Sequence, residues 1–134
     1  MESKTHHDLV LKIDAYVKNI EFVVCNFIAC DIFEYNNTPR KMPEGYFPDL
    51  FYEYKNNLII GEAKTELDFD REHSINQYKS YLNYCDNYSG NSIFILAVPW
   101  NIFVSAKRLL KRLNNGNSKI IILIINDAGV IDRL

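Results

Sequence analysis

Three charged residues near the middle of the chain have the types and spacing of a hydrolytic metal centre. Asp49 follows Pro48 ahead of an apolar and aromatic run, and Glu62 and Lys64 come at the end of the next apolar run. Two carboxylates can hold a hard cation such as Mg²⁺ or Mn²⁺, which polarises a phosphoryl oxygen and lowers the pKa of a bound water. A lysine beside them can orient that water or stabilise charge developing on the phosphorus oxygens. These residue types therefore indicate phosphodiester hydrolysis by a metal-activated water.

A predicted antiparallel hairpin would bring the three residues together. Asn56 and Asn57 separate its two apolar runs, and Asn tolerates the positive φ of tight hairpin turns. This turn predicts the pairs Lys55–Leu58, Phe51–Glu62 and Asp49–Lys64. Because alternate residues of a strand share a face, the two carboxylates and the lysine are expected on one side, with the carboxylates roughly 7–8 Å apart at the backbone. A slip of one residue would break this arrangement.

A helix predicted over residues 71–86 adds polar side chains next to the hairpin. Its apolar row contains Ile75, Tyr78, Leu82 and Cys85, and a second row contains His73, Gln77, Tyr81 and Tyr84. Gln and Tyr can hydrogen-bond a metal-bound water or a phosphate while their stems pack. His73 could act in the same way or in proton transfer, and the plainer interpretation is an ordinary surface residue.

The pattern resembles the PD-(D/E)xK nuclease superfamily, which includes restriction endonucleases, Holliday-junction resolvases and recombination exonucleases. The resemblance rests on Pro48-Asp49, on Glu62-x-Lys64 after an apolar strand, and on Gln77-x-x-x-Tyr81 in the following helix. It implies that Asp49, Glu62 and the backbone carbonyl of Ala63 bind Mg²⁺ or Mn²⁺, with Lys64 as the catalytic lysine and Gln77 in support. It also implies a DNA substrate, which could be branched or single-stranded, and a homodimer or larger nuclease assembly.

Members of that superfamily often carry a further acid on the first helix. Here a helix is predicted over residues 6–19, with Thr5-x-x-Asp8 as a variant capping box. Asp8 in its first turn and Asp14 at the edge of its apolar stripe are the candidates for an additional metal ligand. The alternatives are that Asp8 stabilises the helix dipole and that Asp14 is a solvated charge.

Two basic segments are candidates for contacts with a phosphate backbone. Arg40 and Lys41 lie in a loop predicted over residues 36–46, which leads to Pro48-Asp49, and a helix predicted over residues 102–114 carries Lys107, Arg108 and Lys111. His73 and Tyr81 complete this candidate nucleic-acid surface. A solvated surface is the commoner explanation of such charges. Trp100, just ahead of the second segment, is interpreted as a packing residue in preference to a base-stacking platform.

The remaining pattern predicts one α/β domain over residues 1–134. Strands are expected at 21–35, in the two arms of the hairpin, at 92–98 and at 119–126. The 102–114 helix is expected to face inward with Val104, Leu109, Leu110 and Leu113. Residues 128–134 carry no clear signal. The resulting order αβββαβαβ is that of a restriction-endonuclease-like core, a mixed central sheet flanked by helices.

Composition sets further limits. The 134 residues are 48% hydrophobic, which is enough for a core, and the formal net charge of −2 gives no global basic signal. Three cysteines without zinc-site spacing indicate reduced core thiols, and together with the polar N-terminus they predict a cytoplasmic protein.

Two other functions compete with a nuclease. One is a catalytically inactive nuclease-fold module that binds nucleic acid or a partner protein, and the other is an α/β domain unrelated to nucleic acids. The complete set of two acids and a lysine favours the enzyme, because a degenerate site is expected to lose a metal ligand. The sequence leaves open DNA or RNA, endonuclease or exonuclease attack, and the number of metal ions.

Overall fold

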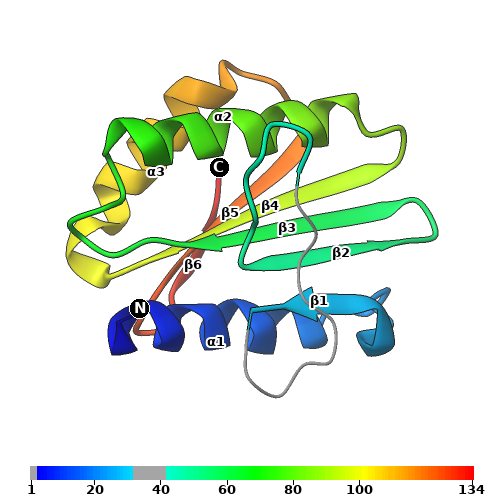
Figure 1. The fold of residues 1–134 in the computed structure, drawn as a ribbon, viewed down its shortest axis with the longest axis horizontal. Coiled ribbons are helices and arrows are strands. Elements are labelled where there is room, and N and C mark those ends of the chain that lie inside the picture. The colour runs from blue at the N-terminus through cyan, green and yellow to red at the C-terminus, as the bar shows by residue number, and fades with distance from the viewer. Residues whose placement is uncertain (1–2, 32–41) are drawn as a thin grey trace.

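The computed structural model describes residues 3–31 and 42–134, which form a six-stranded mixed sheet with helices on both faces (Figure 1). The helices are α1 (Lys4–Lys18), α2 (Glu72–Asn87) and α3 (Phe103–Asn114), and short 3-10 helices are formed by Cys25–Phe27 and Trp100–Ile102. The strands are β1 (Ile28–Cys30), β2 (Leu50–Tyr54), β3 (Asn57–Ala63), β4 (Asn91–Val98), β5 (Ile120–Asn126) and β6 (Ile131–Arg133). The predicted α/β class with a mixed central sheet is confirmed.

The order of strands in the sheet follows the chain, from β1 to β6. β1, β2 and β3 pair antiparallel, β3, β4 and β5 pair parallel through the crossovers that contain α2 and α3, and β6 closes the far edge antiparallel to β5. The carboxyl ends of β3, β4 and β5 therefore meet at one edge of the sheet. The first turns of α1 and α2 lie at the same edge (Figure 1).

Two apolar layers hold the sheet between its helices. On one face α2 and α3 pack over β3, β4 and β5 through residues that include Tyr78, Leu110 and Phe94, and on the other face α1 packs through Leu9, Ile13 and Val17. Gly61 of β3 permits the close approach of α1, because a Cβ at this position would lie only 2.8 Å from Cγ2 of Ile13. This contact seats α1 along β3 and brings its first turn to the carboxyl end of that strand.

The hairpin of β2 and β3 is two residues out of its predicted register. Its turn consists of Lys55 and Asn56, with φ angles of 48° and 64°, so Tyr54 pairs with Asn57 and Leu50 pairs with Gly61. The predicted turn at Asn56 and Asn57 was wrong, and so were the pairs Phe51–Glu62 and Asp49–Lys64. Because the slip is two residues, every side chain keeps its face. Extending the observed register by one residue places Asp49 opposite Glu62 instead of Lys64.

The first helix was predicted well except for its cap. Ser3, not Thr5, is the N-cap of α1, and its Oγ accepts a hydrogen bond from the backbone N–H of His6 at 3.1 Å. The long strand predicted over residues 21–35 is replaced, as far as the described residues extend, by a 3-10 turn and the three residues of β1. The described residues end at 31 and resume at 42.

The C-terminal third differs from its prediction at two points. Val104 of α3 is 54% exposed, and the buried residues of that helix are Phe103, Ala106, Leu109 and Leu110. Residues 131–133, which carried no sequence signal, form the edge strand β6.

Among the described residues, no helix combines the length and the apolar character that crossing a membrane requires.

Candidate functional site

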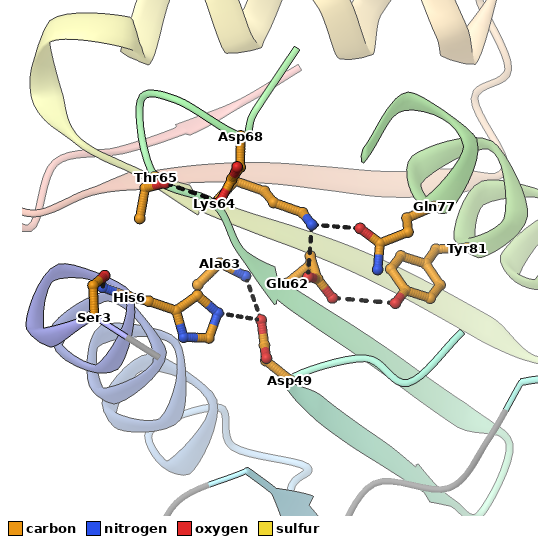
Figure 2. Close-up of polar contacts among 10 residues, drawn as sticks. All are labelled: Ser3, His6, Asp49, Glu62, Ala63, Lys64, Thr65, Asp68, Gln77 and Tyr81. Carbon is orange, nitrogen blue, oxygen red and sulfur yellow. Dashed lines mark hydrogen bonds and ion pairs between the residues drawn. The ribbon is translucent and has the colours of Figure 1, made fainter. Parts of the chain in front are cut away.

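The predicted acids and lysine meet at the carboxyl end of β3 (Figure 2). Glu62 and Ala63 are the last residues of β3, Lys64 is the first residue beyond it, and Asp49 immediately precedes β2. Both carboxylates are nearly inaccessible, with 7% of Asp49 and 4% of Glu62 exposed. The hairpin thus holds two acids and one lysine in a small buried volume, as its sequence predicted, although through a different register.

Asp49 is fixed by contacts from two other elements. Its Oδ2 accepts a hydrogen bond of 2.8 Å from the backbone N–H of Ala63 and lies 3.2 Å from Nε2 of His6 on α1. Its own carbonyl accepts a 2.8 Å hydrogen bond from the backbone N–H of Asp31, just beyond β1. The position of this carboxylate is therefore set jointly by β3, α1 and the end of β1.

Glu62 points toward α2 (Figure 2). The hydroxyl of Tyr81 donates to Oε1 of Glu62 at 3.2 Å, and Nζ of Lys64 lies 3.5 Å from Oε2. Tyr81 is fully buried, so this hydroxyl has no competing solvent. Each oxygen of Glu62 thus has a partner, one neutral and one cationic.

Lys64 is directed by α2 as well as by the sheet. Its Nζ donates a hydrogen bond to Oε1 of Gln77, a side chain that is 8% exposed, and its backbone N–H donates to the carbonyl of Ala97 on β4 at 3.0 Å. Gln77 and Tyr81 are four positions apart, so both project from one face of α2. This face of α2 therefore supplies Gln77 as the hydrogen-bond acceptor for Lys64 and Tyr81 as the hydrogen-bond donor to Glu62.

The electrostatics of this cluster are unbalanced. Burial raises the pKa of Glu62 well above its usual range, and the charge of Asp49 and a side-chain hydrogen bond with Asp49 raise it further. Lys64 and the Tyr81 hydroxyl act in the opposite direction without cancelling the rise. Burial and the charge of Glu62 also raise the pKa of Tyr81, which keeps its hydroxyl a proton donor. Two buried carboxylates face one lysine, and a second positive charge would stabilise them.

The available donors fit a hard divalent cation. Asp49 and Glu62 offer carboxylate oxygens that interact with each other, and the main-chain carbonyl of Ala63 follows Glu62 directly at the end of β3. Mg²⁺ and Mn²⁺ prefer oxygen ligands, and Mg²⁺ usually keeps several waters. Across residues 3–31 and 42–134, no three His, Cys, Asp or Glu side chains converge as a ready-made metal cluster. The donors that this site offers to a cation are two carboxylates, a carbonyl and any bound water.

The first-helix acids are not the groups that α1 brings to Asp49. Asp8 is exposed, and Asp14 forms an ion pair of 2.8 Å with Lys18. His6 approaches Asp49 instead, and the sequence interpretation missed it because only acids were sought on this helix. His6 precedes Val10, Ile13 and Val17 at helical spacing, so it lies on the buried side of α1. This periodicity was the sequence signal that could have predicted that His6 faces the sheet.

The other candidate residues are spread more widely. His73 is exposed and its ring lies edge-on to Tyr46, with centroids 5.6 Å apart, and Tyr46 lies in the same manner 6.4 Å from Tyr81. Lys107 pairs with Asp132 of β6 at 2.5 Å, and Arg108 and Lys111 are exposed on α3. Arg40 and Lys41 lie outside the described residues.

In comparisons with known proteins, no protein-family model, curated protein or solved structure matches the chain.

Proposed function

We propose that this chain is a divalent-metal-dependent nuclease of the PD-(D/E)xK type, built on a restriction-endonuclease-like core, that hydrolyses DNA phosphodiester bonds. The observation that carries the proposal is the placement of Lys64. Its ammonium lies between Glu62 and the buried Gln77, beside a pair of carboxylates whose repulsion it only partly offsets. A lysine whose only task was to neutralise Glu62 would not need a second, buried acceptor from another helix.

The residues divide the chemistry among themselves. Asp49, Glu62 and the Ala63 carbonyl would hold Mg²⁺ or Mn²⁺, which when bound supplies a Lewis acid and a water of lowered pKa. Lys64 orients the nucleophile or stabilises negative charge that develops on the phosphorus oxygens. Gln77 fixes the direction of Lys64, and Tyr81 fixes the direction of Glu62. His6 restrains Asp49 from the side of α1.

The contacts favour an enzyme over an inactive nuclease-fold module. A module that only binds nucleic acid gains nothing from two buried acids, because their charge repels phosphate. Losing one of them would also relieve the repulsion that raises the pKa of Glu62. Retention of both acids, with the lysine held by Gln77, fits a site that uses their charge.

The proposed setting is the cytoplasm, and the proposed assembly is a homodimer or a larger nuclease assembly. All three cysteines are free: Cys30 and Cys85 are buried, as predicted, whereas Cys25 is exposed, contrary to the prediction of a core thiol. An exposed free thiol is compatible with a reducing compartment.

Cleavage assays with matched variants test the proposal. A panel of linear duplex, single-stranded and four-way-junction DNA, with RNA of the same sequence, would be incubated with Mg²⁺, Mn²⁺ or EDTA. We expect metal-dependent cleavage that Glu62→Ala and Lys64→Ala abolish, while Asp8→Ala, which removes an exposed acid of α1, retains it. Folded wild-type protein that cuts no member of the panel with either metal would refute the nuclease.

A further inference from the structure

The only tryptophan of the chain is an exposed side chain on a fixed backbone. Trp100 is 69% exposed and begins the 3-10 helix that links β4 to α3. Its backbone N–H donates to Oδ1 of Asp127 at 2.9 Å, and the backbone N–H of Ile102 donates to the carbonyl of Pro99 at 3.2 Å. The interpretation of Trp100 as a packing residue was wrong. The exposed ring on this anchored turn is available to a binding partner.

Trp100 lies close to the candidate site along the backbone. Ala97 of β4 pairs with Ala63, and its carbonyl accepts the hydrogen bond from the N–H of Lys64. Trp100 follows three residues later, so its Cα lies at most about 11 Å from that of Ala97. The backbones of Trp100 and Lys64 therefore lie near neighbouring strand ends on the same side of the sheet's strand termini.

The exposed face continues from Trp100 along α3. Val104, Arg108 and Lys111 are exposed and lie four and three residues apart, which places them along one side of α3, and Trp100 precedes Val104 by four residues in the 3-10 helix. From Asn87 to Asn126 the chain has five cations and no acid, and the rest of the chain has ten cations and seventeen acids. Among the described residues, acids that reach this region from neighbouring elements include Asp132, paired with Lys107, Asp127 at the Trp100 turn, and Asp86, whose carboxylate accepts a hydrogen bond of 2.6 Å from Asn117.

We propose that the surface formed by Trp100, Val104, Arg108 and Lys111 binds single-stranded nucleic acid and leads it to Lys64. The proposal rests on the proposed nuclease function and specifies its substrate. An exposed indole can stack on an unpaired base, whereas the bases of a duplex are already stacked on one another. The cations further along the helix can follow the phosphates of the same strand. The face thus combines the two features by which proteins hold single strands.

Charge argues for a single strand and against two other occupants. A chain of net charge −2 with buried acids at its site has little general attraction for the dense phosphates of a duplex. A second copy docked by the same surface about a two-fold axis would bring the cationic patch of Arg108 and Lys111 against the same cationic patch of its partner. Neither occupant complements the surface as a flexible strand with free bases does.

The single tryptophan supplies a direct probe. A deoxythymidine oligonucleotide would be titrated into the wild-type protein in EDTA, which prevents metal-dependent cleavage, while tryptophan emission is recorded. We expect saturable quenching by the single strand and at least tenfold weaker binding of the same strand annealed to its complement. Binding without any change in emission, or equal affinity for the duplex, would overturn the proposal.

The binding surface can be located by measuring, from the fluorescence anisotropy of a labelled oligonucleotide, the affinity of single-residue variants. Trp100→Ala should weaken binding roughly tenfold, Trp100→Phe should retain most of the affinity, and the charge reversal Arg108→Glu should weaken it and lower its salt dependence. The matched control is Phe22→Ala. Phe22 is 42% exposed and lines a cavity with Asn57 and Asn91, at the amino ends of β3 and β4 and away from the site. Equal losses in Phe22→Ala and Trp100→Ala, or sedimentation showing that Trp100 mediates self-association, would refute the assignment.

These results separate the two proposals. Quenching of Trp100 by the oligonucleotide without cleavage in Mg²⁺ or Mn²⁺ would reject the nuclease and keep the binding surface. Cleavage that depends on Glu62, with unchanged affinity in Trp100→Ala, would reject the binding surface and keep the nuclease.

Discussion

Two lysines at opposite ends of the sheet show how differently this protein uses a positive charge. Lys119, just before β5, donates to the backbone carbonyls of Tyr88 at 2.6 Å, Cys85 at 3.4 Å and Asp86, and so caps the carboxyl end of α2. Lys64, just after β3, meets Glu62 and the first half of the same helix through Gln77. Each lysine joins a strand to α2.

The difference lies in what surrounds each ammonium. The carbonyls at the end of α2 are orphan acceptors that a cation satisfies, and the cation completes the structure there. At Lys64 one ammonium serves two buried carboxylates, and burial together with the charge of Asp49 leaves the pKa of Glu62 raised. We infer that the Lys119 end is purely structural, whereas the Lys64 end retains an unmet demand for a second cation.

The largest expected effect separates the two lysines directly. Lys64→Met should lower cleavage by about 100- to 1,000-fold, the scale of removing one electrostatic stabiliser from a transition state, and should leave the fold intact. Lys119→Met should leave cleavage within about twofold and lower the free energy of unfolding by about 1–2 kcal/mol, because the helix end loses its charged donor. Cleavage rates and urea unfolding of both variants measure this. Similar losses of activity in both would remove the distinction between the two ends.

A smaller effect is expected at the residue that directs Lys64. Gln77→Ala should reduce cleavage about 10- to 100-fold with little change in metal affinity, since Gln77 contacts the lysine and neither carboxylate lies among its hydrogen-bond partners. Gln77→Glu retains an acceptor and should recover part of the rate. The comparison requires single-turnover rates alongside metal titrations. A loss of metal binding in Gln77→Ala that accounts for the whole effect would argue against a positioning role.

His6 provides a third comparison, between two adjacent histidines. His6→Asn should weaken Mn²⁺ binding by about tenfold, because the side chain restrains Asp49 at 3.2 Å. His7→Asn is the matched control on the next position of α1 and should leave the affinity unchanged. Calorimetric titration of both variants would show whether only His6 matters.

The smallest effect concerns pH. Between the ordinary pKa of a glutamate and the raised pKa of Glu62, the folded protein holds a proton that the unfolded chain has released. The free energy of unfolding of the metal-free protein should therefore fall as pH rises through that interval, by up to about 1.4 kcal/mol per pH unit. Below the interval this contribution is flat. Urea unfolding in EDTA should give this slope for the wild type and a flatter curve for Glu62→Gln, and parallel curves would contradict the assignment.

Much of the fold was accessible from periodicity alone. The three helices lie within two residues of their predicted ends, and the apolar runs at β4 and β5 are buried strands. The hairpin register was missed because Lys55, a residue that seldom adopts positive φ, takes the turn position expected of Asn57. β6 was missed because its three residues have no pattern of their own and depend on pairing with β5.

The candidate site was predicted in part. Asp49, Glu62, Lys64, Gln77 and Tyr81 do come together. The contribution of α1 was assigned to the wrong residue type, since the approach of His6 depends on how closely Gly61 lets that helix pack. The exposure of Trp100 could not be predicted because an aromatic residue after a buried strand usually packs. Tertiary packing decided each of these points.

The most direct test of the central claim is a calorimetric titration of Mn²⁺ into the metal-free wild-type protein and Glu62→Gln at neutral pH. The account predicts saturable binding at one or more sites in the wild type, with a matching gain in stability of about 2.7 kcal/mol at a hundredfold excess over Kd, and at least tenfold weaker binding in Glu62→Gln. Wild-type protein that binds no Mn²⁺, or a variant that binds it equally well, would contradict the claim that the buried carboxylates hold a cation.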